Sequence, residues 1–234
     1  MKQILFVLAL FMGFMSFAQT LNQFDANGKR DGKWKKNFEG TDVVRYEGAF
    51  QHGKEIGVFK FYKNIKGEPV LTATRAFNPN TDTAKVTFLG STGKVISEGF
   101  MRDKTYIGEW KYYHNNGTQI MTLEHYSNKG LLEGARYVYY LSGQVAEKTL
   151  YEIGKLHGKT LGYAENGTVI KEHHYKMGNL HGEAKFYDEA GGLLVEGSYR
   201  NDQKHGIWKY YENGTLKEEK DFTPKTNNPY KKSN

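Results

Sequence analysis

The sequence predicts an all-β protein, an elongated single-layer antiparallel β-meander built from about eight hairpin repeats of about 24 residues. Its composition is the first reason. Hydrophobic residues are only 38% of the 234 residues, yet there are 17 Tyr, 14 Phe and 27 Gly beside 4 Pro. Abundant aromatic residues and glycines, with little aliphatic content, favour many short strands joined by tight turns over a thick aliphatic core.

The second reason is a glycine that recurs at a fixed interval. Gly158, Gly182 and Gly206 follow one another at intervals of 24 residues, and each follows a histidine. Nearer the N-terminus, one interval of double length predicts a unit in which Ala84 replaces the glycine. The repeat-turn positions predicted in this way are Gly57, Gly108, Gly134, Gly158, Gly182 and Gly206.

Each unit is predicted to contain two strands. In the unit that begins at Gly108, Trp110 and Tyr112 share one face by period-two alternation, whereas Lys111 and Tyr113 share the other. Asn-Gly pairs then reverse the chain, because this dipeptide tolerates the positive φ of tight hairpin turns. About 14–16 short strands are expected, and no segment of the repeat region has the 3.6-residue periodicity of a helix. The Asn-Gly pairs begin at Asn116, Asn166 and Asn213.

The N-terminal segment predicts export. Lys2 precedes an uncharged apolar run from Ile4 to Phe17, and Ser16 and Ala18 fit a cleavage point before Gln19. The run is shorter than the roughly 20 residues of a spanning helix. We therefore expect no transmembrane span after cleavage and a final location in the periplasm, in the outer envelope or outside the cell. The predicted segments are a signal peptide (1–18), an N-terminal linker (19–27), the repeat domain (28–222) and a disordered basic tail (223–234).

Charge and cysteine content exclude several functions. The formal net charge is +7, and acids and bases are interleaved along the repeats, which is typical of a solvated surface and not of a nucleic-acid-binding site. Because there is no cysteine, disulfides, cysteine–zinc sites and thiol nucleophiles are excluded.

Neither the histidines nor the glutamates predict chemistry. His157, His181 and His205 occupy one repeat position, so neighbours should lie about 10 Å apart, too far to share a zinc ion. The recurring glutamates are interpreted as partners of lysines on adjacent strands. We expect no catalytic residue, no metal site and no cofactor. These glutamates are Glu172, Glu196 and Glu219.

The aromatic residues at corresponding repeat positions are the candidate binding face. Two interpretations are open: the rings pack along the sheet as its internal contacts, or a stripe of them remains exposed to hold a partner. The candidate residues are Trp34, Phe59, Trp110, Tyr112, Phe186, Trp208 and Tyr210.

One segment carries a family resemblance. Tyr46 to Gly57 resembles a MORN repeat, with the pattern Y-x-G-x-[FW]-x-x-G-x-x-x-G. The 24-residue form, with a Glu-Asn-Gly-Thr hairpin and a closing Glu-x-x-Tyr, resembles the bacterial MORN-variant repeats of YwqK-family antitoxins. The resemblance implies an elongated interaction platform for proteins, or for phospholipid head groups in some members, and no catalytic residues. An exported immunity protein would reconcile the antitoxin resemblance with the signal peptide.

These observations predict an exported, non-catalytic repeat protein that serves as a protein-binding platform. The alternative is an envelope-associated module that binds phospholipid or glycan.

Overall fold

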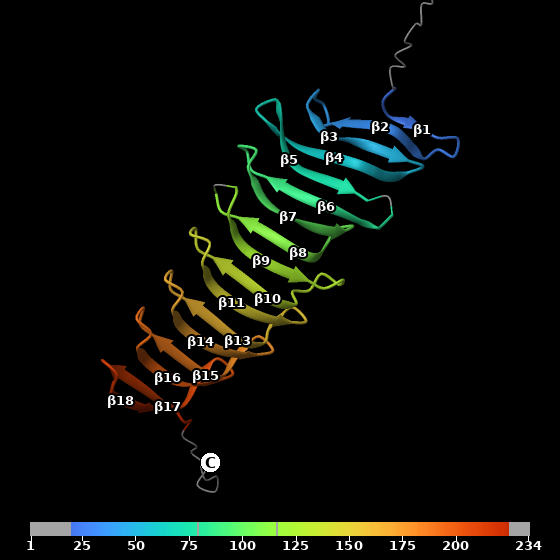
Figure 1. Cartoon of the computed structure of the whole chain (residues 1–234). Helices are drawn as coiled ribbons and strands as arrows, with labels where there is room; N and C mark the ends of the chain where they lie inside the picture. The colour runs from blue at the N-terminus through green and yellow to red at the C-terminus, as the bar shows by residue number, and fades with distance from the viewer. Residues whose placement is uncertain (1–19, 79, 116, 225–234) are drawn as a thin grey trace, which may run out of the picture.

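The chain forms one open antiparallel sheet. The computed structural model describes residues 20–78, 80–115 and 117–224, and these residues contain 18 strands and no helix. Each hairpin lies beside the next along one long axis, from the blue N-terminal strands to the red C-terminal ones (Figure 1). The predicted all-β, single-layer meander is confirmed. The predicted signal peptide and almost all of the predicted tail lie outside the described residues.

The strands follow one another in chain order, and each pairs with the next, except that the two-residue strand β12 and the strand β13 both pair with β11. Eight hairpins result, as the repeat interval predicts; the extra strands beyond the expected 14–16 include two of only two residues. The strands are β1 (Gln23–Phe24), β2 (Arg30–Asn37), β3 (Val44–Gln51), β4 (Lys54–Ile65), β5 (Glu68–Phe77), β6 (Thr83–Leu89), β7 (Val95–Arg102), β8 (Thr105–Tyr113), β9 (Ile120–Tyr126), β10 (Gly134–Tyr139), β11 (Val145–Glu152), β12 (Lys155–Leu156), β13 (Gly158–Tyr163), β14 (Val169–Lys176), β15 (Asn179–Tyr187), β16 (Leu193–Arg200), β17 (Gln203–Glu212) and β18 (Thr215–Asp221).

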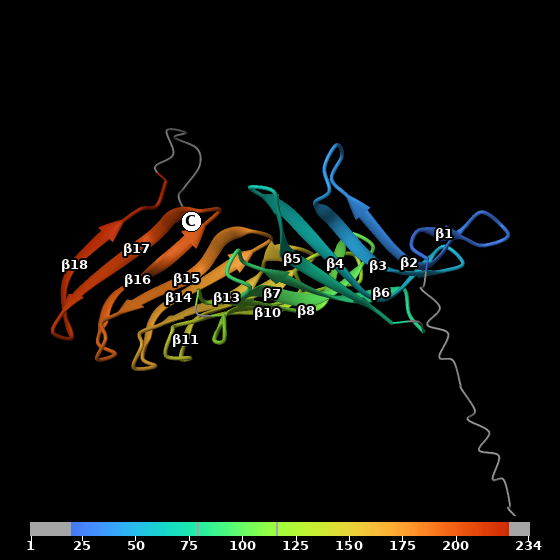
Figure 2. The ribbon, with the colours of Figure 1, turned by 90° about the horizontal axis from the view of Figure 1, so that it is seen from above.

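The sheet is twisted along its length. Viewed from above, β2–β5 and β16–β18 run in clearly different directions (Figure 2). Rotation between neighbouring strands is the ordinary consequence of L-residue geometry, and it accumulates over many strands. At about 4.8 Å per strand, 18 strands span roughly 80 Å.

The two Asn-Gly pairs that the structure fully describes make different turns, and Asn116 lies outside the described residues. Asn213 and Gly214 both have positive φ, 51° and 74°, as a two-residue hairpin turn requires. At Asn166-Gly167 only the glycine has positive φ, because the turn has three residues between Ala164 and Thr168, whose backbones bond at 2.8 Å. Asparagine is therefore placed at the left-handed position in one turn and not in the other.

The recurring glycines are bulge positions, which corrects their prediction as turn positions. Gly57, Gly108, Gly182 and Gly206 lie inside strands, and Gly134 and Gly158 are the first residues of strands. All six have positive φ, from 63° to 103°. At the four internal sites the register shifts, so that the glycine-bearing strand accommodates extra residues. The sequence shows that glycine is needed at these positions. It does not distinguish a bulge from a turn, because both require a positive φ.

Candidate functional site

All seven candidate aromatic residues lie on one face of the sheet, which we call the tryptophan face. Its central row runs through directly opposed residues of successive strands, for example Phe59, Arg75, Val86, Gly99 and Trp110. Tyr112, Phe186 and Tyr210 lie one row closer to the hairpin turns, because each is two residues beyond a central-row position.

Three of these rings are buried although the sheet has a single layer. Phe59, Trp110 and Trp208 are 1%, 0% and 1% exposed. Each packs on a glycine of the preceding strand, and a Cβ added to Gly99 would lie 2.4 Å from the ring of Trp110. Of the two interpretations that the sequence leaves open, internal packing holds for these three residues: their rings are packed inside the sheet and are not presented to a partner.

A second side chain covers several of the rings from outside. This side chain belongs to the residue two positions before a glycine of positive φ, which is Gly32, Gly108 or Gly206. Tyr106 stacks on Trp110 with centroids 3.9 Å apart. Lys204 Nζ lies 4.0 Å from the centroid of the Trp208 ring, and Arg30 lies 4.8 Å from that of Trp34. These contacts explain how an exposed sheet face buries its largest side chains.

The middle of the tryptophan face holds a polar network. Glu124 accepts hydrogen bonds from Tyr126 Oη at 2.7 Å and from Arg136 Nε at 2.9 Å. Arg136 also lies 3.8 Å from Glu147. Burial and the hydrogen bond to Glu124 raise the pKa of Tyr126. Each carboxylate here has a cation beside it, so the network is a paired structural feature with no free general base.

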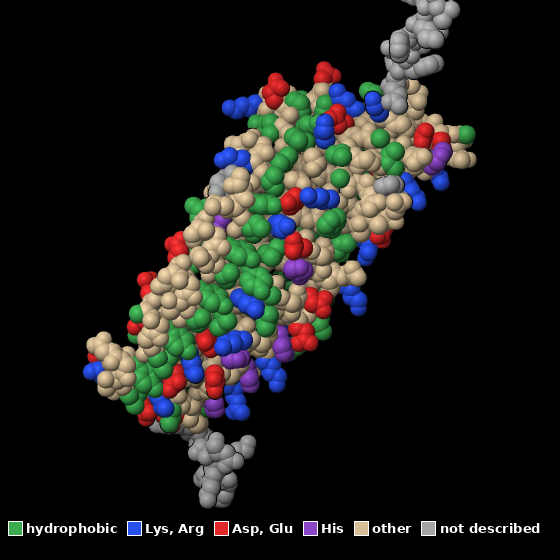
Figure 3. All heavy atoms as spheres, in the orientation of Figure 1, with side chains coloured by type: hydrophobic (Ala, Val, Ile, Leu, Met, Phe, Trp, Pro, Cys, Tyr) green, Lys and Arg blue, Asp and Glu red, His purple; other side chains and the backbone are tan. Residues whose placement is uncertain are grey.

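The opposite face carries a continuous row of tyrosines and aliphatic residues, which we call the tyrosine row. In each hairpin from β4 to β18, a residue next to the turn opposes an aliphatic residue on the partner strand. Figure 3 shows hydrophobic side chains gathered in a band along the hairpin-turn side of this molecule. The row contains the pairs Tyr62–Leu71, Leu89–Val95, Tyr113–Ile120, Tyr139–Val145, Tyr163–Val169, Tyr187–Leu193 and Tyr211–Leu216.

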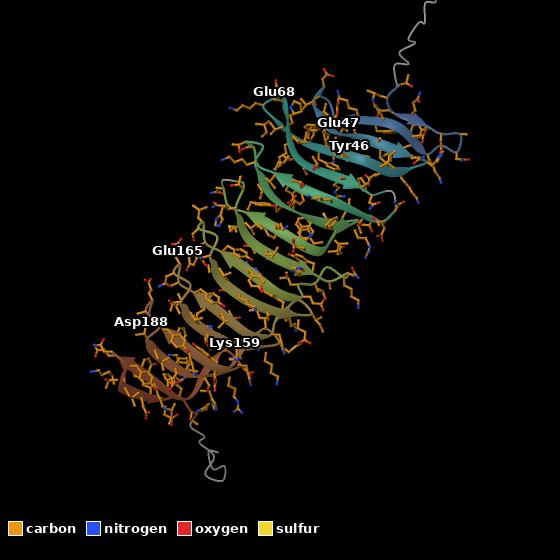
Figure 4. All side chains as sticks on the ribbon, viewed as in Figure 1. Tyr46, Glu47, Glu68, Lys159, Glu165 and Asp188 are labelled. Atoms are coloured by element: carbon orange, nitrogen blue, oxygen red, sulfur yellow. The ribbon has the colours of Figure 1, made fainter. Side chains whose placement is uncertain are left out.

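The turns that border this row lie along one long side of the sheet. Figure 4 places Glu165 and Asp188, which belong to successive turns, on that side, with Lys159 near the opposite strand ends. The tyrosines of the row are half-buried, so part of each ring remains accessible. Over 14 strands the row extends for roughly 60 Å.

Glutamates fix three of these tyrosines. Tyr62, Tyr113 and Tyr211 donate to Glu47, Glu98 and Glu196 over 2.7, 2.8 and 2.7 Å. Burial and this hydrogen bond raise the pKa of Tyr62 and of Tyr113 to about 12. The same hydrogen bond lowers the pKa of Glu47. The carboxylates hold the rings in one orientation, which reduces the entropy that a partner must remove on binding.

The recurring glutamates and histidines occupy the positions that the repeat predicts. Glu172 pairs with Lys159 at 2.7 Å, and Glu196 lies 3.8 Å from Lys209, so cross-strand pairing with lysine is observed for both. Glu219 is directly opposite Lys209. His157, His181 and His205 each immediately precede a bulge glycine. Within the described residues, no cluster of three or more His, Asp or Glu side chains is suited to a metal ion.

The tyrosine row is the surface that sequence reasoning missed. The sequence feature that marks this row is a pair of adjacent aromatic residues that recurs beside the turns. These doublets are Phe61-Tyr62, Tyr112-Tyr113, Phe186-Tyr187 and Tyr210-Tyr211. The first member of each doublet points to the tryptophan face and the second to the tyrosine row. Three first members, Tyr112, Phe186 and Tyr210, are among the candidate residues, and no second member is.

Comparisons with known proteins recognise the repeat in the C-terminal half. The profile of the MORN repeat variant matches residues 132–152, 156–177, 180–201 and 204–223. These four matches coincide with the last four hairpins. The N-terminal hairpins share the same register shifts beside their turns, although that profile does not match them.

Other comparisons add little. No curated protein matches the chain. A solved structure titled as that of TcdB2-TccC3-Cdc42 aligns with 84% of this chain at 12% identity and a TM-score of 0.21, and the alignment spans 13% of that structure's chain. A likeness at this level carries no argument about function. Among the described residues, none belongs to a helix long and apolar enough to cross a membrane.

Proposed function

We propose that this protein is an exported, non-catalytic platform that binds another protein through its tyrosine row. The continuous row of half-buried tyrosines carries this proposal. Tyrosine supplies a large contact area with few rotatable bonds, and it is enriched at the centres of protein interfaces. A strip of roughly 60 by 14 Å offers about 800 Å², the area that one partner contributes to an ordinary specific complex.

The kind of partner follows from the resemblance to MORN-variant antitoxins. A toxin-like protein encountered outside the cytoplasm would make this chain an exported immunity protein. The charged row beside the tyrosines supports recognition of a protein, because its lysines and glutamates alternate from β14 to β18 and can meet mixed charges on a partner.

The test uses the two members of one doublet. Residues 19–234 are purified and used to capture partners from envelope and secreted fractions of the source cells, and captured proteins are identified by mass spectrometry. Tyr187→Ser should weaken binding of a saturable protein partner by about tenfold or more, as loss of an interface tyrosine does. Phe186→Ser is the matched control on the opposite face, and folding of both variants is followed by circular dichroism.

Two outcomes would reject the proposal. One is a partner whose affinity is the same for Tyr187→Ser and for the unmodified chain. The other is retention of phospholipid vesicles or cell-wall glycan with no saturable protein, which would favour the envelope-associated alternative.

A further inference from the structure

The first hairpin units contain a hollow on the same side of the sheet as the cross-strand pair Glu47–Lys60. It has a volume of about 490 Å³ and lies between β2, β3 and β4, with Leu21 at one side. This volume is within the range of small-molecule sites. The tyrosine row, in contrast, is an open strip of about 800 Å². The hollow therefore differs in kind from the proposed protein-binding surface.

The floor of the hollow is apolar because of one small residue. Ala49 is directly opposite Ile56, and Val58 lies beside them with 54% of its surface exposed. Four other units place larger side chains at the position of Ala49, immediately before the closing aromatic residue or methionine. These are Phe100, His125, Leu150 and His174, whereas Ala76 and Ser198 are also small. The methyl group of alanine leaves open the space that these side chains occupy.

The N-terminal segment closes one side of the hollow. Asn22 has a positive φ of 61°, and its side-chain Oδ1 accepts a hydrogen bond from the backbone N–H of Lys35 at 2.9 Å. The backbone N–H of Asn22 donates to the carbonyl oxygen of Lys33 at 2.9 Å. These two bonds fix Leu21 against the hollow, so its apolar wall does not depend on a free chain end.

The rim of the hollow is cationic. Lys33, Lys35 and Lys60 line it, together with a single carboxylate, that of Glu47. Glu47 already accepts a hydrogen bond from Tyr62 and lies 3.4 Å from Lys60 Nζ. Lys35 is directly opposite Glu47, whereas Lys33 is opposite Ala49, so three lysines share one carboxylate and the rim has an excess of positive charge. An occupant that complements the site must combine an apolar body with an anionic end.

We propose that this hollow binds a small apolar carboxylate, a molecule with an acyl or aryl body and one carboxylate group. The apolar body would lie on Ala49, Ile56 and Val58, and the carboxylate would lie near the ammonium groups of Lys33 and Lys35. This site adjoins the first tyrosine of the row, because Glu47 on its rim accepts the hydrogen bond of Tyr62, but it does not depend on the proposed protein partner.

Octanoate is the probe, and its uncharged analogue 1-octanol is the comparison. Isothermal titration of residues 19–234 should show one octanoate per chain, bound about tenfold more tightly than octanol. Ala49→Leu fills the hollow and should weaken octanoate by about tenfold or more, equivalent to about 1.4 kcal/mol. Ser198→Leu makes a similar change at the corresponding position of a later unit and should alter the affinity by less than about twofold.

Lys35→Gln tests the charge without disturbing the packing. It should reduce the preference for octanoate over octanol, because only the charged ligand loses an interaction. Circular dichroism confirms that each variant is folded. The proposal is overturned by the absence of octanoate binding, by equal affinities for octanoate and octanol, or by an Ala49→Leu protein that binds octanoate normally.

Discussion

Single glycines in this protein serve two distinct purposes, and substitution by alanine separates them. Gly99 lies under the ring of Trp110, where an added Cβ would come within 2.4 Å. Gly108 is in the adjacent strand with a φ of 63°, and no heavy atom lies within 4 Å of its added Cβ. The first glycine provides space for a ring, and the second provides a backbone conformation.

Gly99→Ala should be the more damaging of the two substitutions. Displacing Trp110 from its packed position costs about 1–3 kcal/mol of the free energy of unfolding, as overpacking does. Gly108→Ala should cost about 1 kcal/mol, the strain of the left-handed conformation, and Gly108→Asn should recover part of it. Urea unfolding of the three variants measures these differences. Equal losses for Gly99→Ala and Gly108→Ala would contradict the distinction.

Within a strand, the alternation of faces was predictable, whereas burial was not. The opposite orientations of Tyr112 and Tyr113 follow directly from period two. The complete burial of Trp110 required knowledge that Tyr106 turns back over it, and that depends on the bulge at Gly108 between them. A sequence shows the glycine and both rings, but the bulge determines that they stack.

The burial of the largest candidate rings has a related cause. Trp34, Trp110 and Trp208 are the largest aromatic residues and were natural candidates for contact with a partner. In a sheet of one layer, however, large rings provide most of the available packing, so Trp110 and Trp208 are almost completely covered by their neighbours, whereas Trp34 at the N-terminal end is partly buried. The smaller tyrosines beside the turns remain half-buried.

Strand β14 introduces a dependence on pH. His173 is 9% exposed among the rings of Tyr175, Phe186 and Tyr199, and neither ring nitrogen has a hydrogen-bond partner among the described residues. Burial lowers the pKa of His173 from 6.5, and the positive charge of Lys171 adds to this effect. Folding therefore favours the neutral imidazole.

The consequence is a loss of stability in mild acid. A histidine with a depressed pKa in the folded state contributes fully above pH 6.5, and this contribution is lost as the pH falls toward the folded-state value. The free energy of unfolding should decrease between pH 7.5 and pH 5.5. The ordinary pKa of glutamate is 4.5, and the pKa values of Glu47 and Glu98 are lowered from it. Both carboxylates therefore remain charged throughout this pH interval.

Substitution of His173 isolates its contribution. His173→Phe places an apolar ring among aromatic neighbours and should remove most of the decrease between pH 7.5 and pH 5.5. His174→Gln is the control, because the adjacent side chain points to the opposite face. A His173→Phe protein that loses as much stability in acid as the unmodified chain would exclude this explanation.

Across the full sheet, stability should depend mainly on contacts between neighbouring strands. Strand pairing is confined to strands close in sequence, and the buried cluster of Val86, Met101 and Trp110 joins two adjacent hairpins. Such an architecture behaves as a linear array in which each unit interacts with the units on either side. A unit should therefore be removable if the phase of the repeat is kept.

Deletion of residues 158–181 tests this property. The deletion removes β13 and β14 and joins His157 to Gly182, which restores the His-Gly pair before the bulge. The shortened chain should fold, with a urea m-value lower by about one eighth and a maximum dimension shorter by about 10 Å in solution scattering. It should also lose the acid dependence attributed to His173.

A half-unit deletion is the matched control. Removal of residues 158–169 eliminates β13 but leaves most of β14 to follow β11. The direction of every later strand, and the face of every later side chain, would then be reversed relative to its partner. We expect this protein to lose the cooperative unfolding transition of its C-terminal units. If both deletions unfold the protein equally, contacts beyond neighbouring strands must contribute, because only the first deletion preserves the repeat.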